Sequence, residues 1–301
     1  MRKARRDGWP CKFIVVSRDE NKHIAARQAY PDARYVVCDV LDQQRLNLIM
    51  QGVATVIHAA AAKHIPVCEY QPSEALRVNI DGTRCVIDAA YAAGVDSLVL
   101  ISTDKACEPV NTYGATKMLV ERLVFESRDF EHFSTAIMGC RYGNIIGSTG
   151  SIWPVFKAQR ERDGYLSVTD PTMTRYFWSI EEAVDLITYS LNGPRATVLL
   201  PTLRAIVMHD LAEYLTLKWG LPSYKIIGSR PGEKKHEMLL SPNERARTRV
   251  LGNGRWALYG PTVKINPEYP TIASGDVFTS DTASPLSPEE FVSIAEDSET
   301  V

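Results

Sequence analysis

Short apolar runs alternate with longer amphipathic patterns through the first half of this 301-residue sequence. Residues 20–30, 73–94 and 114–128 carry apolar side chains at intervals of three and four, which is the spacing of one helix face. The runs between them are rich in β-branched residues and predict strands at 12–17, 33–40, 54–60, 97–103 and 134–147. Because strands that alternate with helices form βαβ units, we predict an α/β fold with a doubly wound parallel sheet of the Rossmann type.

The pattern changes near residue 148. Residues 149–251 hold shorter elements interrupted by proline and glycine, which predicts a smaller, mainly substrate-binding lobe beside a nucleotide-binding domain of residues 1–148. Residues 252–301 are rich in Gly, Pro, Ser and Thr and have weak periodicity, so we expect a loosely ordered tail. Within this tail, Ser287 followed by Pro-Glu-Glu predicts the start of one short helix.

Composition argues against several kinds of partner and site. The 34 basic and 36 acidic residues give a formal net charge of -2, so no overall field favours nucleic acid or an anionic membrane. No stretch reaches the roughly 18 apolar residues of a membrane span, and we expect no membrane segment in this chain. The six cysteines stand singly, which indicates reduced thiols and a cytoplasmic location. The histidines lack metal-ligand spacing, so we expect no metal site.

Two residues one helical turn apart suggest redox chemistry. Tyr113 and Lys117 open a predicted helix and lie on the same face of it. A nearby ammonium lowers the pKa of a phenol, which makes Tyr113 a candidate general base for an alcohol that loses a hydride. Thr103 ends the preceding strand, where open α/β sheets bind ligands, and its hydroxyl could bond to the same substrate oxygen.

Seven motifs carry a resemblance to a known family. They are HAAAAKH (58–64), VNIDGT (78–83), ISTDKA (101–106), NTYGATK (111–117), RYGNIIGS (141–148), TMTRYF (172–177) and RPGEKKHEML (230–239). In this order they resemble the extended short-chain dehydrogenase/reductase superfamily. More narrowly, the sequence from 12 to 250 is similar to the nucleotide-sugar 4,6-dehydratases that act on UDP-N-acetylglucosamine in capsular-polysaccharide and flagellin-glycan synthesis. STDKA together with RPGEKxHE is much more specific than the tyrosine and lysine alone.

The resemblance implies a reaction with two kinds of proton transfer. Thr103, Tyr113 and Lys117 would serve oxidation at C4 of the sugar, with hydride passing to NADP. Asp104 and Lys105 would supply the acid/base pair that eliminates water across C5 and C6, after which hydride returns to C6. The implied enzyme is a lyase whose cofactor ends as it began. NAD is the less favoured cofactor.

The resemblance also implies binding residues. Together with Tyr113 and Lys117, the residues implied to contact NADP are Ser17, Arg18, Asp19, Asp39, Val40, His58, Ala59, Ala60 and Lys63. An arginine at a strand end selects the 2'-phosphate of NADP. The residues implied to contact the UDP-sugar are Lys63, Asn144, Arg175, Arg230 and Glu233. Arginine suits this role because its planar fork of donors matches phosphate. Asn79 resembles an asparagine that orders the active-site strands through backbone hydrogen bonds.

The sequence departs from the family pattern at its start. A protein of this kind begins with a strand and a glycine-rich turn that receives the pyrophosphate at a helix N-terminus, whereas only Gly8 precedes the first predicted strand. We therefore expect residues 1–11 to form the end of a helix and its loop. We also expect the sheet to lack one central strand, which leaves neighbouring edges unpaired. A start codon placed too far downstream, a partial gene and a degenerate protein would each explain the difference.

The residues leave three functions open. A 4,6-dehydratase uses the elimination pair Asp104 and Lys105, whereas a nucleotide-sugar C4 epimerase needs only Thr103, Tyr113 and Lys117. A non-catalytic protein that binds sugar nucleotides is the third. Members of the resembled family often pair through a helical bundle, so we expect a homo-oligomer with the helices at 74–94 and 114–128 in its interface.

Overall fold

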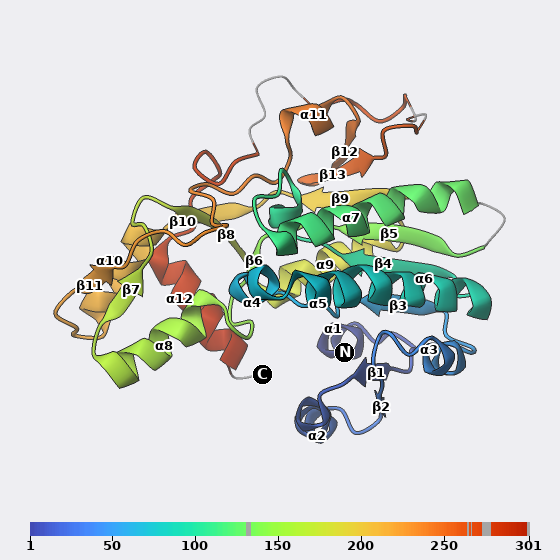
Figure 1. The fold of residues 1–301 in the computed structure, drawn as a ribbon, viewed down its shortest axis with the longest axis horizontal. Coiled ribbons are helices and arrows are strands. Elements are labelled where there is room, and N and C mark those ends of the chain that lie inside the picture. Colours follow the sequence, from blue (N-terminus) through green and yellow to red (C-terminus); the bar gives the residue numbers. More distant parts are fainter. Residues whose placement is uncertain (131–133, 264, 266, 273–277, 300–301) are drawn as a thin grey trace.

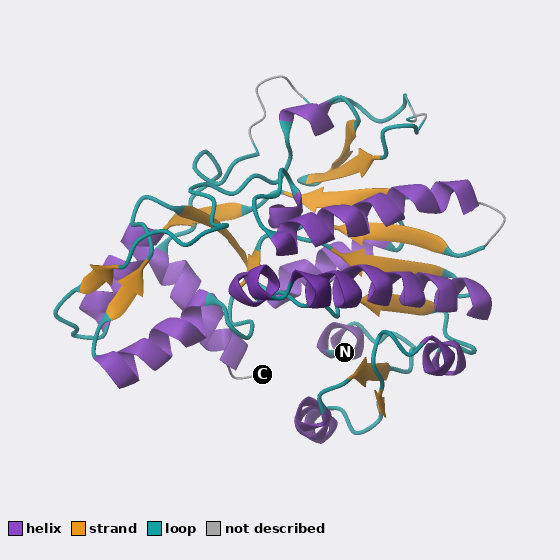
Figure 2. Ribbon diagram, in the orientation of Figure 1, coloured by secondary structure: helices purple, strands orange, loops and turns teal. Residues whose placement is uncertain are grey.

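The main sheet has six strands in the order β12-β13-β9-β5-β4-β3 (Figures 1 and 2). The computed structural model describes residues 1–130, 134–263, 265, 267–272 and 278–299. The strands are β3 (Thr55–His58), β4 (Ser97–Ile101), β5 (Ala136–Cys140), β9 (Thr197–Pro201), β12 (Thr248–Gly252) and β13 (Arg255–Tyr259). The first four are parallel, and β13 and β12 are antiparallel additions at one edge. The predicted doubly wound α/β sheet is confirmed.

Helices cover both faces of this sheet. Figure 1 shows α4 to α7 in front of it and α9 behind it. These helices are α4 (Ile65–Tyr70), α5 (Pro72–Leu76), α6 (Gly82–Ala93), α7 (Thr112–Glu126) and α9 (Ile180–Ser190), and α3 (Gln43–Ile49) packs against α6. Sequence explains their ends: Ser179 and Glu182 form a capping box at the start of α9, and Gly94 ends α6 in a left-handed conformation. The layers enclose a continuous apolar core.

Two strands lie outside the main sheet. The strands β1 (Ile14–Ser17) and β2 (Arg34–Val37) pair in parallel with each other, and α2 (Glu20–Ala29) connects them. Among the described strands, β3 pairs with β4 alone, so the sheet is interrupted between β1 and β3 as the sequence predicts. A short helix, α1 (Arg2–Arg6), is anchored to α9, where Lys3 forms an ion pair with Asp185 at 2.8 Å. The expected helix near the start of the chain is therefore present.

A second lobe packs beside the carboxyl ends of the parallel strands (Figure 1). One small sheet has the order β10-β8-β6, and β11 pairs with β7. The elements of this lobe are β6 (Asn144–Ile145), β7 (Leu166–Val168), β8 (Thr174–Trp178), β10 (Arg204–Val207), β11 (Tyr224–Ile226), α8 (Ile152–Asp163), α10 (Met208–Lys218) and α12 (Pro288–Glu299). The lobe has its own core, in which Phe156, Leu211 and Phe291 are fully buried. Burial of each such side chain contributes roughly 1.5–3 kcal/mol.

The expectation of a loosely ordered tail at 252–301 is wrong for much of that segment. Strand β13 pairs with β9 over five residues, and α12 inserts Phe291 against Phe177 with ring centroids 4.9 Å apart. As predicted, α12 begins after Ser287, whose hydroxyl accepts from the backbone N-H of Glu290. Residues 264, 266, 273–277 and 300–301 lie outside the described residues.

The predicted boundary at residue 148 does not separate the two lobes, because segments after it return to the first lobe. Strand β9 and helix α9 belong to the expected lobe of residues 149–251, yet both pack in the main sheet layer. The remaining elements are a π turn (Arg77–Asp81), 3-10 turns (Asp104–Ala106 and Ser127–Phe130) and α11 (Pro242–Arg245). Among the described helices, none has the length and apolar character needed to cross a membrane.

Candidate active site

A cleft of about 720 Å³ lies where the carboxyl ends of β3 and β4 face the second lobe. Both lobes line it. Of the residues that the sequence implies, those in its lining are Ala59, Lys63, Thr103, Lys105, Tyr113, Lys117, Asn144, Arg175, Arg230 and Glu233. The fold thus brings together side chains from several distant segments at the end of the sheet where such proteins bind ligands.

Asn79 fixes the loop that forms one wall of this cleft. Its side-chain oxygen accepts from the backbone N-H of Ala62 at 2.7 Å, and its nitrogen donates to the Ala62 carbonyl oxygen at 3.0 Å and to Thr116 at 2.9 Å. Asn79 sits in the π turn, a local widening of a helix that is frequent at functional sites. The expected backbone role of Asn79 is confirmed, and it ties the loop after β3 to α7.

Helix α7 carries Tyr113 and Lys117 into the lining of the cleft. Asn111 caps it by accepting from the backbone N-H of Gly114 at 2.7 Å. A Cβ at Gly114 would overlap the carbonyl oxygen of Lys105, so only glycine lets the helix start pack this closely against the 3-10 turn that carries Asp104 and Lys105. The close approach sets the separation of Tyr113 from the charged pair.

The charges around Tyr113 differ from the expectation. Burial raises the pKa of Tyr113 to about 12, and the main opposing charge is that of Lys105, not of Lys117. The ammonium of Lys117 instead donates to the backbone oxygen of Ile101 at 2.7 Å. Burial lowers the pKa of Lys117 to about 8. The predicted lowering of the Tyr113 pKa by Lys117 is therefore not what this structure gives.

Lys105 is held among several polar groups. Its Nζ lies 3.1 Å from Oδ1 of Asp104, 3.3 Å from Oε1 of Glu237 and 3.3 Å from Oδ1 of Asn144. Lys105 lines the cleft, whereas Asp104 is fully buried behind it and accepts from the Thr103 hydroxyl at 2.8 Å. Burial alone would lower the pKa of Lys105, but the two carboxylates raise it above its ordinary value. The lysine is therefore charged in this arrangement.

The side chains implied to bind the UDP-sugar come from both lobes. Arg175 on β8 donates to the backbone oxygens of Thr174 and Lys235, and its guanidinium remains in the cleft lining. Arg230 is exposed, and its backbone N-H donates to Glu233 at 3.2 Å. These two arginines place positive charge in the lining of the cleft.

The carboxyl ends of β1 and β2 bring together other residues that the sequence implies as cofactor contacts. Arg18 lies 3.4 Å from the carboxylate of Asp39, and Asp19 caps α2. The Ser17 hydroxyl is bonded to His23 at 2.9 Å. Val40 lies in the loop after β2 and packs against Gly82 at the start of α6, where a Cβ would come within 2.7 Å of it.

His58 and Ala60 behave differently from their neighbour Ala59. The His58 side chain is buried and is bonded to Thr83 at 3.1 Å, so it faces α6 and not the cleft. Burial lowers the pKa of His58 to about 3 with help from the charge of Lys117, which keeps the ring neutral. Ala60 is exposed but does not line the cleft, whereas Ala59 does.

These residues fit the two ends of a nicotinamide dinucleotide. Tyr113 and Lys117 suit the nicotinamide ribose, small Ala59 permits close approach, and Arg18 suits a phosphate at the adenosine end. Within the described part of the chain, no glycine-rich turn follows a strand beside the interruption between β1 and β3. Among the described residues, the backbone donors that such a turn offers to a pyrophosphate are therefore missing at this point of the sheet.

A second buried cluster supports the site from behind. Arg141 follows β5 and donates to both oxygens of Glu121, at 2.9 and 2.5 Å, and to both oxygens of Glu244, at 2.8 and 2.9 Å. Glu121 also accepts from Ser102, the residue before Thr103, at 2.5 Å. The Arg141 side chain is 1% exposed and Glu121 is 3% exposed. The cluster links α7, the end of β4 and α11.

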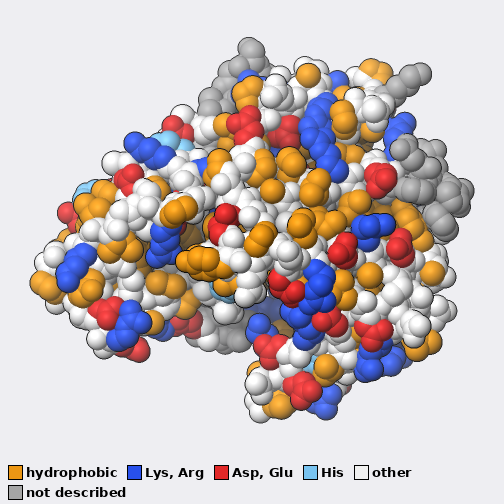
Figure 3. Space-filling model, in the orientation of Figure 1, with side chains coloured by type: hydrophobic (Ala, Val, Ile, Leu, Met, Phe, Trp, Pro, Cys, Tyr) orange, Lys and Arg blue, Asp and Glu red, His pale blue; other side chains and the backbone are white. Residues whose placement is uncertain are grey.

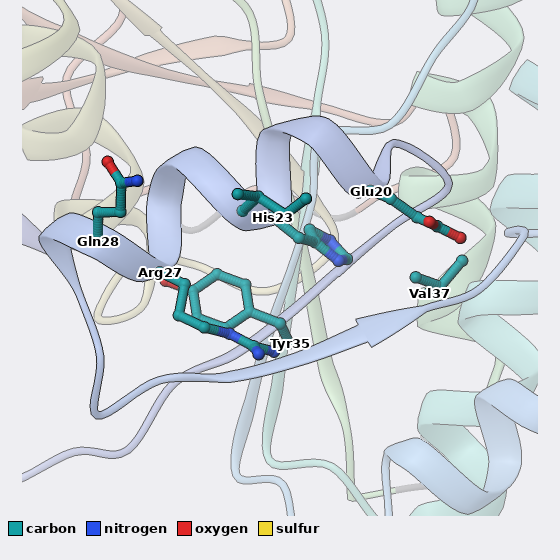
Figure 4. A pocket seen from close by; sticks show the side chains of 7 residues that line it. Glu20, His23, Arg27, Gln28, Tyr35 and Val37 are labelled. Carbon is teal, nitrogen blue, oxygen red and sulfur yellow. The ribbon is translucent and has the colours of Figure 1, made fainter.

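A second hollow lies on the outer side of β2 (Figure 4). Its side chains come from α2 and β2, and the Arg27 guanidinium lies over the Tyr35 ring at 5.3 Å. Of the buried polar atoms that lack a partner in the described residues, none belongs to this hollow. His23, its most buried polar side chain, is already bonded to Ser17. The hollow is a shallow groove between two surface elements.

The fold and the cleft define a Rossmann-like protein of the short-chain dehydrogenase/reductase class, with a tyrosine and a lysine one helical turn apart at the carboxyl end of a parallel sheet. The model of the family described as polysaccharide biosynthesis protein matches residues 6–255. The chain belongs to that family.

Comparisons with known proteins give two kinds of relative. A UDP-N-acetylglucosamine 4,6-dehydratase (inverting) of Campylobacter jejuni is 38% identical over 261 residues, which cover 85% of this chain and 77% of the relative. A UDP-glucose 4-epimerase of Rickettsia felis is 36% identical over 243 residues, which cover 79% and 71%. The X-ray structure of Pen from Bacillus thuringiensis superposes with a TM-score of 0.85 at 30% identity and covers 96% of this chain and 90% of that one.

Sequence reasoning missed one residue of the cluster around Lys105. Glu237 belongs to the motif RPGEKKHEML but received no role. Its signal was a second acidic residue in a motif that already contains Glu233. Only the fold shows that Glu237 meets the lysine of a motif far earlier in the sequence.

Proposed function

We propose that the protein is a nucleotide-sugar 4,6-dehydratase that acts on UDP-N-acetylglucosamine in surface-glycan synthesis. The observation that carries this proposal is the Asp104 and Lys105 pair, 3.1 Å apart, whose lysine lies in the same cleft wall as Thr103 and Tyr113 while the aspartate is buried behind it. Oxidation at C4 needs a hydroxyl, a phenol and a lysine, whereas elimination of water needs a further acid and base. The similarity to the Campylobacter dehydratase supports the same function.

The residues of the cleft would divide the reaction into two parts. Once ionised, the Tyr113 phenolate would receive the proton of the C4 hydroxyl while the Thr103 hydroxyl bonds to the same oxygen. The 4-keto group then makes the C5 proton acidic. After Lys105 has passed its proton to Asp104, its amine, which faces the cleft, would accept the C5 proton and give it to the C6 hydroxyl, which leaves as water. Asp104 is fully buried, so we propose that it exchanges a proton with Lys105 across their 3.1 Å contact and does not touch the sugar.

We propose NADP as the cofactor, held by Arg18 and Asp39 at the adenosine end and by Tyr113 and Lys117 at the other. When bound, a nicotinamide dinucleotide would accept hydride from C4 of the sugar and return it to C6. The Lys117 ammonium already lies at the end of β4, bonded to Ile101. The exposed Arg18 guanidinium is the donor suited to a 2'-phosphate.

The proposed function has a direct test. Purified protein should convert UDP-N-acetylglucosamine into a product lighter by one water, with one deuterium gained at C5 when the reaction is run in deuterated water. Mass spectrometry with and without added NADP measures both changes, because proton removal at C5 exposes that carbon to solvent. Heat-denatured protein is the control. Unchanged substrate under both conditions would contradict the proposal.

We further propose a homo-oligomer formed through α4, α5 and α7. Large apolar side chains on these adjacent helices are exposed, among them Tyr70 at 83%, Leu76 at 47% and Leu119 at 41%. Figure 3 shows hydrophobic side chains gathered over the same helices. Light scattering should give a mass above 33.6 kDa, and Leu119→Glu should reduce it to that of one chain. A monomeric parent protein would refute this interface.

The state of the cysteines bears on the cellular compartment. The six cysteines are free thiols in the structure, four of them buried, which suits a reducing compartment. We therefore propose that the reaction takes place in the cytoplasm.

A further inference from the structure

Glu237 lies beside the proposed elimination pair, and the mechanism above gives it no role. Its carboxylate Oε1 lies 3.3 Å from Nζ of Lys105 and 3.9 Å from Nε of Arg175. The Glu237 side chain is 4% exposed and does not belong to the cleft lining. It therefore sits behind Lys105, on the side away from the place where a substrate would bind.

The backbone around Glu237 is fixed from two directions. Its N-H donates to the Ser280 hydroxyl at 2.8 Å, and the Ser280 N-H donates to its carbonyl oxygen at 2.8 Å. On the other side, the preceding residue His236 is bonded to Thr174 of β8 at 2.8 Å. A carboxylate carried by a segment held in this way has a defined position relative to Lys105.

The Lys105 cluster and the Arg141 cluster differ in one respect. In the Arg141 cluster, every carboxylate oxygen of Glu121 and Glu244 accepts a hydrogen bond. In the Lys105 cluster, Oδ2 of Asp104 and Oε2 of Glu237 are buried and have no hydrogen-bond partner among the residues that the structure describes. A buried carboxylate oxygen without a donor costs free energy, so a purely structural ion pair gains nothing from a second carboxylate. Unsatisfied groups of this kind are typical of functional sites.

We propose that Glu237 is a positioning residue of the elimination site: its carboxylate holds the ammonium of Lys105 at the cleft wall and keeps it charged. The role rests on the proposed dehydratase function, because it concerns the lysine of that reaction. Glu237 acts through Lys105 and does not contact the sugar.

The electrostatic surroundings of Lys105 explain why Glu237 matters. The charged or titratable groups that face it are Asp104 from its own turn, Glu237, Arg175 from β8 and Tyr113 from α7, and Asn144 adds a neutral oxygen. Burial and Arg175 lower the pKa of Lys105, and the two carboxylates raise it further than these lower it. With Glu237 neutral, Asp104 would be the remaining nearby acid against burial and Arg175.

The test is the isosteric change Glu237→Gln. The pH at which the Lys105 ammonium titrates should fall by about 1–3 units, since an opposite charge within a few ångströms shifts a pKa by that amount. Nitrogen NMR of labelled lysine side chains measures this, with the Lys105 signal identified by its loss in Lys105→Met. The limb of the pH profile of water loss that Lys105 sets should move to lower pH by the same amount.

Two further variants distinguish positioning from mere stability. Glu237→Asp keeps the charge and should keep the Lys105 titration close to that of the parent protein while lowering the rate. Glu296→Gln is the matched control, because Glu296 pairs with exposed Lys218 and should leave the titration unchanged. A Lys105 signal that does not move in Glu237→Gln would overturn the proposal.

The parent protein supplies an independent measurement if Glu237→Gln fails to fold. Its Lys105 should stay protonated at a pH where exposed lysines have lost their proton, and titration together with them would overturn the proposal. If Lys105 titrates as expected but no nucleotide sugar loses water, the proposed function fails while the charge-holding role of Glu237 stands.

Discussion

Replacing Lys105 with methionine should slow the loss of water from UDP-N-acetylglucosamine by about 10²–10⁴-fold, the usual contribution of a positioned acid or base. Methionine keeps the length of the side chain but removes the group that faces the cleft and exchanges protons with Asp104. Removal of hydride from C4 should continue because Thr103, Tyr113 and Lys117 remain, but it should be slower, since Lys105 supplies the main charge that lowers the pKa of Tyr113. Product mass measures the first effect, and the absorbance of reduced nicotinamide in a single turnover measures the second.

Lys105→Arg and Lys218→Met are the controls for this result. Arginine retains a charge between Asp104 and Glu237, so a folded but inactive Lys105→Arg would show that the charge alone is not sufficient. Lys218 is exposed and does not line the cleft, and its replacement should leave turnover unchanged. Full turnover by Lys105→Met, with a C4-inverted sugar as product, would favour the epimerase instead.

Replacing Arg141 with methionine should destabilise the protein by about 3–5 kcal/mol, the usual cost of breaking a buried ion pair. The change leaves the carboxylates of Glu121 and Glu244 buried and uncompensated. Such a loss is a large share of the roughly 5–15 kcal/mol of a typical domain. Urea unfolding at neutral pH measures it. The control Arg162→Met removes an exposed pair with Asp163 and should change stability by less than about 0.5 kcal/mol.

The same cluster predicts a dependence on pH. Burial would raise the pKa of Glu244, but its bonds with Arg141 hold that pKa at about 2, below the ordinary value of 4.5. A lowered folded-state pKa contributes stability that is fully present above pH 4.5 and is lost as the pH falls toward 2. In Arg141→Met this acid-dependent loss should shrink. An unchanged slope would show that Arg141 does not set the titration of Glu244.

Sequence periodicity predicts the first half of the fold well because its elements are local. The strand expected at 54–60 is β3, and the helix expected at 20–30 is α2. The run 134–147 is divided, because Gly143 must fit against Tyr176 and the chain then leaves the main sheet for the second lobe. Strand β13 was missed because glycines flank it and its stability comes from pairing with β9, which is remote in sequence.

In the candidate site too, the sequence predicts the positions that depend on local structure and not those that depend on long-range packing. Motifs place Thr103, Tyr113 and Lys117 correctly at the end of β4 and the start of α7, since these positions follow from one strand, one turn and one helix. The burial of Asp104, the bond from Lys117 to Ile101 and the approach of Glu237 depend on packing between segments far apart in the chain. The spacing of residues in the sequence does not predict such contacts.

The position of α12 has a consequence for how the protein is made. Phe291 on this helix packs against Trp153 and Phe177, which belong to elements more than a hundred residues earlier. Synthesis runs from the N-terminus, so the growing chain exposes the apolar faces of α8 and β8 until α12 has left the ribosome. Strand β9 waits in the same way for β13. Both lobes thus complete their cores only after β13 and α12 have been synthesised.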